Sequence, residues 1–203
     1  MFTLMSAVLL LSSLFLSGAP EAARGKESEA ANEAKIKRGE YLVKVTGCGD
    51  CHSPKIITPN GPEADPARLL SGYPSGAKLT DIPAGVIGPG KWGVLGTNDM
   101  TAWVGPWGVS FGANLTPDVE TGLGGWTEEM FIQTMRTGKH LGAGRPILPP
   151  MPCYNIAQLD DPDLSAMFAY LKTIKPIKNA VPFPIPPAGK KSKVPQWRSG
   201  FNH

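Results

Sequence analysis

Two cysteines and a histidine in the pentad Cys48-Gly49-Asp50-Cys51-His52 carry the clearest chemistry in this sequence. On one turn of helix, two thiols three residues apart can each add across a vinyl group of one haem. The histidine that follows the second cysteine then lies under the iron as its proximal ligand. We therefore predict one covalent haem c, attached through Cys48 and Cys51, with His52 as an iron ligand.

The same cysteine spacing occurs in zinc half-sites and in redox dithiols, and these are the two alternatives. A structural zinc site needs a second pair of Cys or His ligands, whereas the chain has only one further cysteine, Cys153. A thioredoxin-like motif is expected within a βαβ pattern, and the sequence has no such pattern. The histidine next to Cys51 has a role only if the pentad binds haem.

The second axial ligand of the iron is predicted to be Met151. This methionine lies within residues 147–152, where three prolines fix the backbone around one thioether and remove competing amide donors. Apart from Met100, the other methionines beyond the N-terminal stretch are expected on the apolar faces of helices, where they fill the core. His140, Met100 and an open coordination position are the alternatives to Met151.

Three helices are expected to position these residues. The first spans about residues 34–47, has a mostly apolar stripe and leads directly into the pentad. The second begins after Thr127, a suitable N-cap, and ends at Gly138. The third has Asp161 as its N-cap, a proline at its first position and apolar residues at helical spacing, and Pro176 ends it.

The rest of the chain has weaker patterns. Residues 53–126 are dense in Gly and Pro and show no sustained period, so no element is placed there. A haem can supply the core that such a segment lacks, because loops can wrap its large apolar ring. The Pro-rich tail, residues 176–203, is expected to be an extended strap or a loose end. The aromatic residues expected to fill the core are Trp92, Trp103, Trp107, Phe111 and Trp126.

The N-terminal residues predict export. Residues 1–16 form an apolar run followed by small residues, which is typical of a secretory signal peptide, here residues 1–23. The run is shorter than the ~20 residues of a membrane-spanning helix, and an uncleaved N-terminal anchor is the alternative. Residues 24–33 are expected to form a flexible lead-in. The net charge of +3, with no basic stripe, argues against a nucleic-acid partner.

Taken together, these motifs resemble those of bacterial monohaem class I c-type cytochromes, including periplasmic electron-transfer proteins and the cytochrome subunits of dehydrogenases. The match covers residues 34–175, with a looser insertion at about 62–110. Its segments are Arg38-Gly39-x-Tyr41-Leu42-Val43, the pentad, Asn114-Leu115-Thr116-Pro117-Asp118, Thr121-Gly122-x-Gly124-x-Trp126, Met151-Pro152 and Ala169-Tyr170-Leu171.

The resemblance implies a mainly α fold of three to five helices around one covalent haem, with long Gly/Pro-rich loops. It also implies a close crossing of the first and last helices where Gly39 meets Tyr170. Asn114 and Thr116 would lie near the haem edge, and a turn stabilised by their side chains is the alternative. Cys153 departs from the pattern, because relatives usually have an aromatic residue there. We expect a buried thiol, with an intermolecular disulfide or a reactive site as alternatives.

The predicted function is electron transfer in the periplasm, without bond-making catalysis by the protein itself. The expected partners are a periplasmic dehydrogenase or a terminal oxidase or reductase. Ligation by His52 and Met151 favours Fe(II) over Fe(III), so the reduction potential is expected to exceed that of a bis-His haem. The alternatives are a membrane-tethered cytochrome subunit of a dehydrogenase or oxidase complex and, with an open iron face, a haem enzyme or gas-binding protein.

Overall fold

The structure is a computed structural model that describes residues 21–187 of the chain. These residues belong to two compact units, one ending at Glu33 and the other beginning at Ala34. The predicted signal peptide, residues 1–23, lies almost wholly outside the described residues. Among residues 21–187, no helix has both the length and the apolar composition needed to cross a membrane.

Helix α1 (Glu21–Val45) begins earlier than the start predicted near Ala34. Residues 24–33, expected to form a flexible lead-in, are helical, and the side chains from Gly25 to Ala34 are exposed. This stretch has no apolar stripe, which is why periodicity did not predict a helix. Its many Ala and Glu residues nevertheless have high intrinsic helix propensity.

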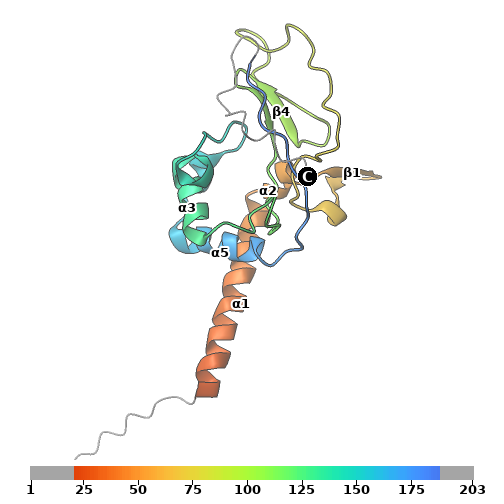
Figure 1. Cartoon of the computed structure of the whole chain (residues 1–203). Coiled ribbons are helices and arrows are strands. Elements are labelled where there is room, and N and C mark those ends of the chain that lie inside the picture. The colour runs from red at the N-terminus through yellow and green to blue at the C-terminus, as the bar shows by residue number, and fades with distance from the viewer. Residues whose placement is uncertain (1–20, 188–203) are drawn as a thin grey trace, which may run out of the picture. The chain divides into compact units, whose positions relative to one another are not determined.

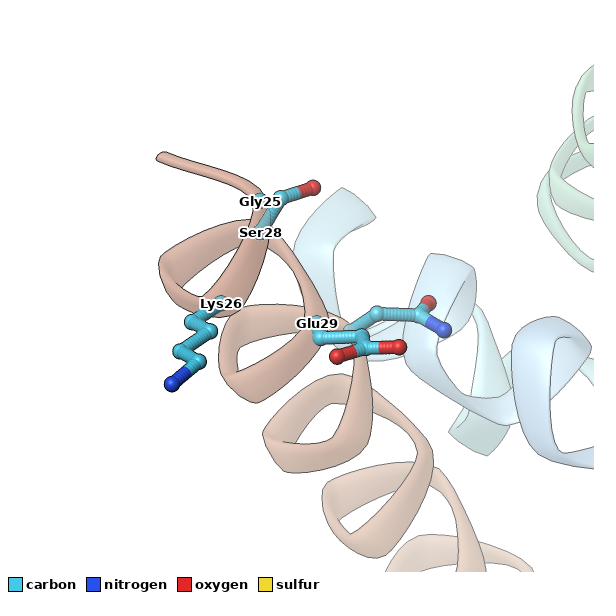
Figure 2. A pocket seen from close by; sticks show the side chains of 5 residues that line it. Gly25, Lys26, Ser28 and Glu29 are labelled. Carbon is cyan, nitrogen blue, oxygen red and sulfur yellow. The ribbon is translucent and has the colours of Figure 1, made fainter. Parts of the chain in front are cut away.

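The first unit has a shallow hollow on the surface of α1 (Figure 2). Neighbouring turns of this one helix supply its walls, and none of the lining residues has a thiol, imidazole or thioether. The hollow therefore offers no haem ligand. Its lining residues are Gly25, Lys26, Ser28, Glu29 and Asn32.

Helices α3 (Glu128–Thr137) and α5 (Asp161–Leu171) pack together in the second unit. Helix α3 has the predicted ends: the Thr127 hydroxyl accepts a hydrogen bond from the Met130 amide at 3.2 Å, and Gly138 ends the helix with a positive φ of 61°. The predicted N-cap of α5 was wrong by one residue. Asp160, not Asp161, accepts a hydrogen bond from the Asp163 amide, at 2.9 Å, because its carboxylate lies three residues before that amide.

The stretch without sustained period contains two small antiparallel sheets. Strand β1 (Lys55–Thr58) pairs with β2 (Gly61–Ala64) in a hairpin. Strands β3 (Leu95–Gly96), β4 (Ala102–Gly105) and β5 (Gly108–Phe111) form the second sheet in that order. Two short helices, α2 (Cys48–His52) and α4 (Cys153–Ile156), complete the set of α-helices in the described part of the chain. The mainly α prediction is therefore only partly met, since sheets and long irregular segments occupy much of the second unit.

One apolar cluster forms the core of the second unit. Helices α1, α3 and α5 all contribute to it, so the three helices that sequence periodicity predicted are the ones that share a core. Leu164 and Leu171 of α5 are almost completely buried. The buried members are Leu42, Val43, Leu70, Leu123, Phe131, Met135, Ile156, Leu164, Met167, Phe168 and Leu171.

The chain after α5 is an extended strap as far as it is described, to Pro187. In Figure 1 this blue segment runs from α5 past α2 towards the sheet that contains β4. At its far end Ile185 pairs with Val109 of β5: the Val109 amide donates to the Ile185 carbonyl at 2.7 Å, and the Ile185 amide donates back at 3.0 Å. Of the two predicted arrangements for the tail, residues 176–187 thus adopt the strap.

Candidate haem site

Helix α2 holds Cys48, Cys51 and His52 on little more than one turn. The chain enters it through Gly47, whose φ of 69° is a left-handed conformation that glycine adopts without steric cost. Both thiols are partly exposed and unpaired, and the Cys48 sulfur lies 3.4 Å from the Thr46 hydroxyl. Burial raises the pKa of both thiols, so they are uncharged at neutral pH.

The imidazole of His52 is buried and held from one side. Its Nδ1 lies 2.8 Å from the Ala113 carbonyl oxygen. A carbonyl can only accept a hydrogen bond, so Nδ1 carries the proton and Nε2 keeps its lone pair. Burial lowers the pKa of His52, which favours the neutral ring. A neutral histidine with one nitrogen pinned and the other available is the form that ligates a metal.

Backbone carbonyls at the end of α2 are bound by a lysine that sequence reasoning missed. The Lys55 ammonium donates to the carbonyls of Gly49 at 3.2 Å, Asp50 at 2.8 Å and Ser53 at 2.6 Å. Burial lowers the pKa of this ammonium, but three carbonyl acceptors and the negative end of the helix dipole favour its charged form. Lys55 therefore caps α2, the helix predicted to attach the haem.

Two glycines let neighbouring loops approach α2 closely. A β-carbon on Gly112 would overlap the Cys51 carbonyl oxygen, and one on Gly72 would lie 2.5 Å from the Gly112 carbonyl oxygen. The Gly72 amide also donates to the His52 carbonyl at 2.7 Å. Residues 70–73 and 111–116 thus pack against the Cys51–His52 end of the pentad, although nothing in their sequence marks them as neighbours.

Met151 lies beside a groove of about 670 Å³ in the second unit. Its partly buried side chain packs against the same apolar cluster as Cys48, so the core joins α2 to the proline-rich loop. The groove wall also includes Trp107, Met135 and Cys153. Two methionines and two aromatic residues, Trp107 and Tyr154, are among the mostly apolar lining residues, which suits contact with a large apolar ring.

The alternative ligands lie in different surroundings. Met100 is 40% exposed and occupies a turn with a left-handed φ of 56°. His140 lies edge-on to Trp126, with 5.3 Å between the ring centroids, in a short 3₁₀ turn after α3. In the described residues, no group of three or more His, Cys, Asp or Glu side chains could hold a metal ion.

Cys153 is a buried thiol, in agreement with the first of the three expectations. It begins α4, and its amide donates to the Met151 carbonyl at 2.9 Å. Burial raises the pKa of the thiol. The residue after the Met-Pro pair therefore packs at the groove without presenting a thiolate.

Asn114 and Thr116 form the turn that was the alternative to a haem-edge position. The side-chain oxygen Oδ1 of Asn114 accepts hydrogen bonds from the Thr116 amide at 3.0 Å and from the Thr116 hydroxyl at 2.7 Å. The Asn114 amide group reaches the strap, donating to the Ile177 carbonyl at 2.8 Å. Both residues are buried, so this motif joins the loop beside His52 to the C-terminal segment.

The residues present suit a covalently attached haem. Two unpaired thiols and a pinned, neutral histidine share one short helix, and the loop with Met151 contacts the same core. Comparison with known proteins points the same way. The chain is similar to dehydrogenase cytochrome c subunits. This agrees with the resemblance predicted from the motifs, and no protein-family model matches the chain.

Three relatives cover most of this chain. The cytochrome c subunit of alcohol dehydrogenase (quinone) from Gluconobacter oxydans is 28% identical over 177 residues, 86% of this chain and 29% of the relative. The gluconate 2-dehydrogenase cytochrome c subunit of Pantoea cypripedii is 27% identical over 179 residues, 85% of this chain and 31% of its own length. The fructose dehydrogenase cytochrome subunit of Gluconobacter japonicus is 27% identical over 191 residues, which are 90% of this chain and 32% of the relative. The chain thus spans less than a third of these relatives.

Proposed function

We propose that this protein is an electron-transfer cytochrome with one haem c, attached through Cys48 and Cys51. The observation that carries the proposal is the buried His52, whose Nδ1 is bound to the Ala113 carbonyl beside two unpaired thiols on the same helix. The haem iron, when present, supplies a one-electron Fe(III)/Fe(II) couple. The protein needs no general acid, base or nucleophile for that task.

The chain's own residues orient and shield the cofactor. His52 offers Nε2 to the iron, and the Ala113 carbonyl fixes the plane of its ring. Met151 is the proposed second protein ligand to the iron, and the prolines around it would hold its thioether in place. A thioether ligand stabilises Fe(II) relative to a second imidazole.

The proposed electron donor is a dehydrogenase, because the relatives are named as cytochrome subunits of alcohol, gluconate and fructose dehydrogenases. We place the protein in the periplasm, where the predicted signal peptide of residues 1–23 would direct it. The second candidate is a subunit held in a dehydrogenase complex by an uncleaved N-terminal anchor. The names of the relatives favour it, since each describes a subunit rather than a free carrier.

The experiment that tests haem attachment uses the protein purified from the periplasm of an expression host that assembles c-type cytochromes. Denatured protein is expected to keep its haem absorbance in acidic butanone and to have the mass of the polypeptide plus one haem. Cys48→Ser and Cys51→Ser variants should each lose one thioether, and Cys153→Ser is the matched control that should keep both. Extraction of the haem from the wild-type protein would contradict the proposal.

A separate measurement distinguishes a free carrier from a complex subunit. The native host membrane is washed with high salt, and the cytochrome is followed with an antibody. A free carrier is expected in the soluble periplasmic fraction, with an N-terminus created by cleavage near residue 23. Retention in the membrane with an intact N-terminus, together with co-purification of a dehydrogenase, would establish the second candidate instead.

A further inference from the structure

Asn179, in the strap after α5, uses its whole side-chain amide to hold one loop. Its Nδ2 donates to the carbonyls of Ser71 at 2.6 Å and Tyr73 at 2.9 Å. Its Oδ1 accepts from the Ser75 amide at 2.9 Å. The side chain is buried, with both donors and the acceptor in use. The sequence did not predict this role, because Asn179 is an isolated asparagine in a Pro-rich tail.

The loop that Asn179 holds is in direct contact with His52. Gly72 lies between the two carbonyls that Asn179 binds, and its amide donates to the His52 carbonyl at 2.7 Å. Gly72 has a φ of 80° and packs against the Gly112 carbonyl, so this loop has little room to shift. Asn179 thereby fixes the backbone contact of His52.

The main chain of Asn179 also fixes the second loop. Its amide donates to the Thr121 hydroxyl at 3.0 Å, and the same oxygen accepts from Asn114 Nδ2 at 3.1 Å. Asn114 is the residue after Ala113, whose carbonyl binds the His52 ring. The two contacts of His52 therefore belong to two loops, and Asn179 is bound to both.

We propose that Asn179 is a positioning residue for His52, acting through the Gly72 and Ala113 contacts. The inference rests on the proposed haem-binding function and deepens it. A hydrogen bond from Nδ1 to a carbonyl orients the imidazole and raises the basicity of its other nitrogen, which stabilises Fe(III). Loss of the Asn179 side chain frees the loop of Ser71 and Tyr73, while the Asn179 amide stays bound to Thr121, so His52 is then held from one loop only and its Nδ1 bond weakens. The reduction potential then rises, and the Nδ1 proton exchanges with water more readily.

The test compares Asn179→Ala with the wild-type haem protein. We expect the His52 Nδ1 proton, followed by NMR in the reduced protein, to exchange about tenfold faster, since the substitution removes three hydrogen bonds of modest net strength. The potential from optical titration should be higher than that of the wild type. Amide exchange at Leu164 in α5 reports on general loosening and should be unchanged.

Two further variants separate positioning from a general effect on the fold. Asn179→Asp keeps the size of the side chain but removes both amide donors and faces two carbonyls with a carboxylate, so it should act as Asn179→Ala does. Lys178→Ala is the matched control. Lys178 lies next to Asn179, and its replacement removes only an exposed ion pair with Glu120, whose charged atoms are 2.7 Å apart. Both the potential and the Nδ1 exchange should stay at wild-type values.

Different results would overturn the proposed haem-binding function and the proposed role of Asn179. A wild-type protein without covalent haem would overturn the proposed function. A haem-loaded Asn179→Ala protein with wild-type Nδ1 exchange, or a Lys178→Ala protein that changes equally, would overturn the role of Asn179. If Asn179→Ala does not fold, Asn179→Asp provides the same test, because it loses the two side-chain amide donors and keeps the main chain. Unchanged Nδ1 exchange in a haem-loaded Asn179→Asp protein would also refute the inference.

Discussion

Gly39 of α1 and Ala166 of α5 lie backbone against backbone. A β-carbon on Gly39 would overlap the Ala166 carbonyl oxygen and would lie 2.9 Å from the β-carbon of Tyr170. The sequence predicted that Gly39 meets Tyr170 at the helix crossing, and this contact is confirmed. The tightest approach, however, is to the main chain of Ala166, one turn earlier. A neighbouring backbone shifts less easily than a neighbouring side chain to make room for an added side chain.

Gly39→Val is expected to lower the melting temperature, with a loss of about 1–3 kcal/mol in the free energy of unfolding from overpacking. Because α1 leads into Cys48, the displaced helix should also loosen the haem pocket and let imidazole compete with Met151 more easily. Thermal melts and imidazole titrations measure both effects. Gly25→Ala, which meets nothing within 4 Å, is the control and should not destabilise. A Gly39→Val protein as stable as the wild type would show that the crossing is not tight.

Met151→Ala is expected to remove the weak long-wavelength charge-transfer band of the oxidised protein and to lower the reduction potential. Loss of the thioether also opens the sixth coordination position to water and, in the reduced protein, to carbon monoxide. Optical spectra with and without carbon monoxide follow both changes. Met100→Ala and His140→Ala are the comparison variants. If either of them produced these changes while Met151→Ala did not, the ligand assignment would be wrong.

Lys55→Met should destabilise the protein by about 1–2 kcal/mol, because three carbonyls at the end of α2 lose a charged hydrogen-bond donor. Methionine keeps most of the length and apolar contact of the stem, so the difference reports on the ammonium. Urea unfolding measures it. Lys44→Met removes an exposed pair with Glu40 four residues away and should have a smaller effect. Equal losses in the two variants would argue against a capping role for Lys55.

Asp163 and Arg38 link α5 to α1 by two hydrogen bonds, both 2.8 Å long. The hydrogen bond from the Arg38 guanidinium lowers the pKa of Asp163. The unfolded chain therefore takes up a proton at higher pH than the native state does. The resulting stabilisation is complete above the ordinary aspartate pKa, about 3.9, and disappears as the pH falls through the lowered native value.

Asp163→Asn should therefore lower stability at pH 6 and have a diminishing effect as the pH falls below about 4. Urea unfolding across this range gives the difference between the two proteins. The exposed position of Arg38 keeps the effect small. In an Arg38→Gln background the same substitution should change little, because the partner is already gone. An effect of Asp163→Asn that stays constant with pH would exclude the ion pair as its cause.

Local sequence determined the elements with local causes. The pentad, the caps of α3 and the buried faces of α3 and α5 depend on residues within a few positions of one another, so motif spacing, capping rules and periodicity identify them, whereas Tyr41 and Val45, predicted in the apolar stripe of the first helix, are exposed. Reliance on local patterns also explains why the predicted N-cap of α5 and the predicted start of α1 were wrong. Asp160 and Asp161 are adjacent and chemically identical, and only the geometry of the turn selects the cap of α5. The N-terminal turns of α1 lack the apolar face that periodicity detects.

Only the tertiary structure decided what surrounds His52. The ring binds a carbonyl 61 positions away, and Asn179 binds one 108 positions away. Every residue type has a backbone carbonyl, so no side chain in the sequence identifies these acceptors. Strands of two to four residues are likewise too short for a visible period, and their partners are set by how the loops fold. The sequence by itself therefore predicted which residues would attach a haem, whereas packing between distant loops decided how His52 is held.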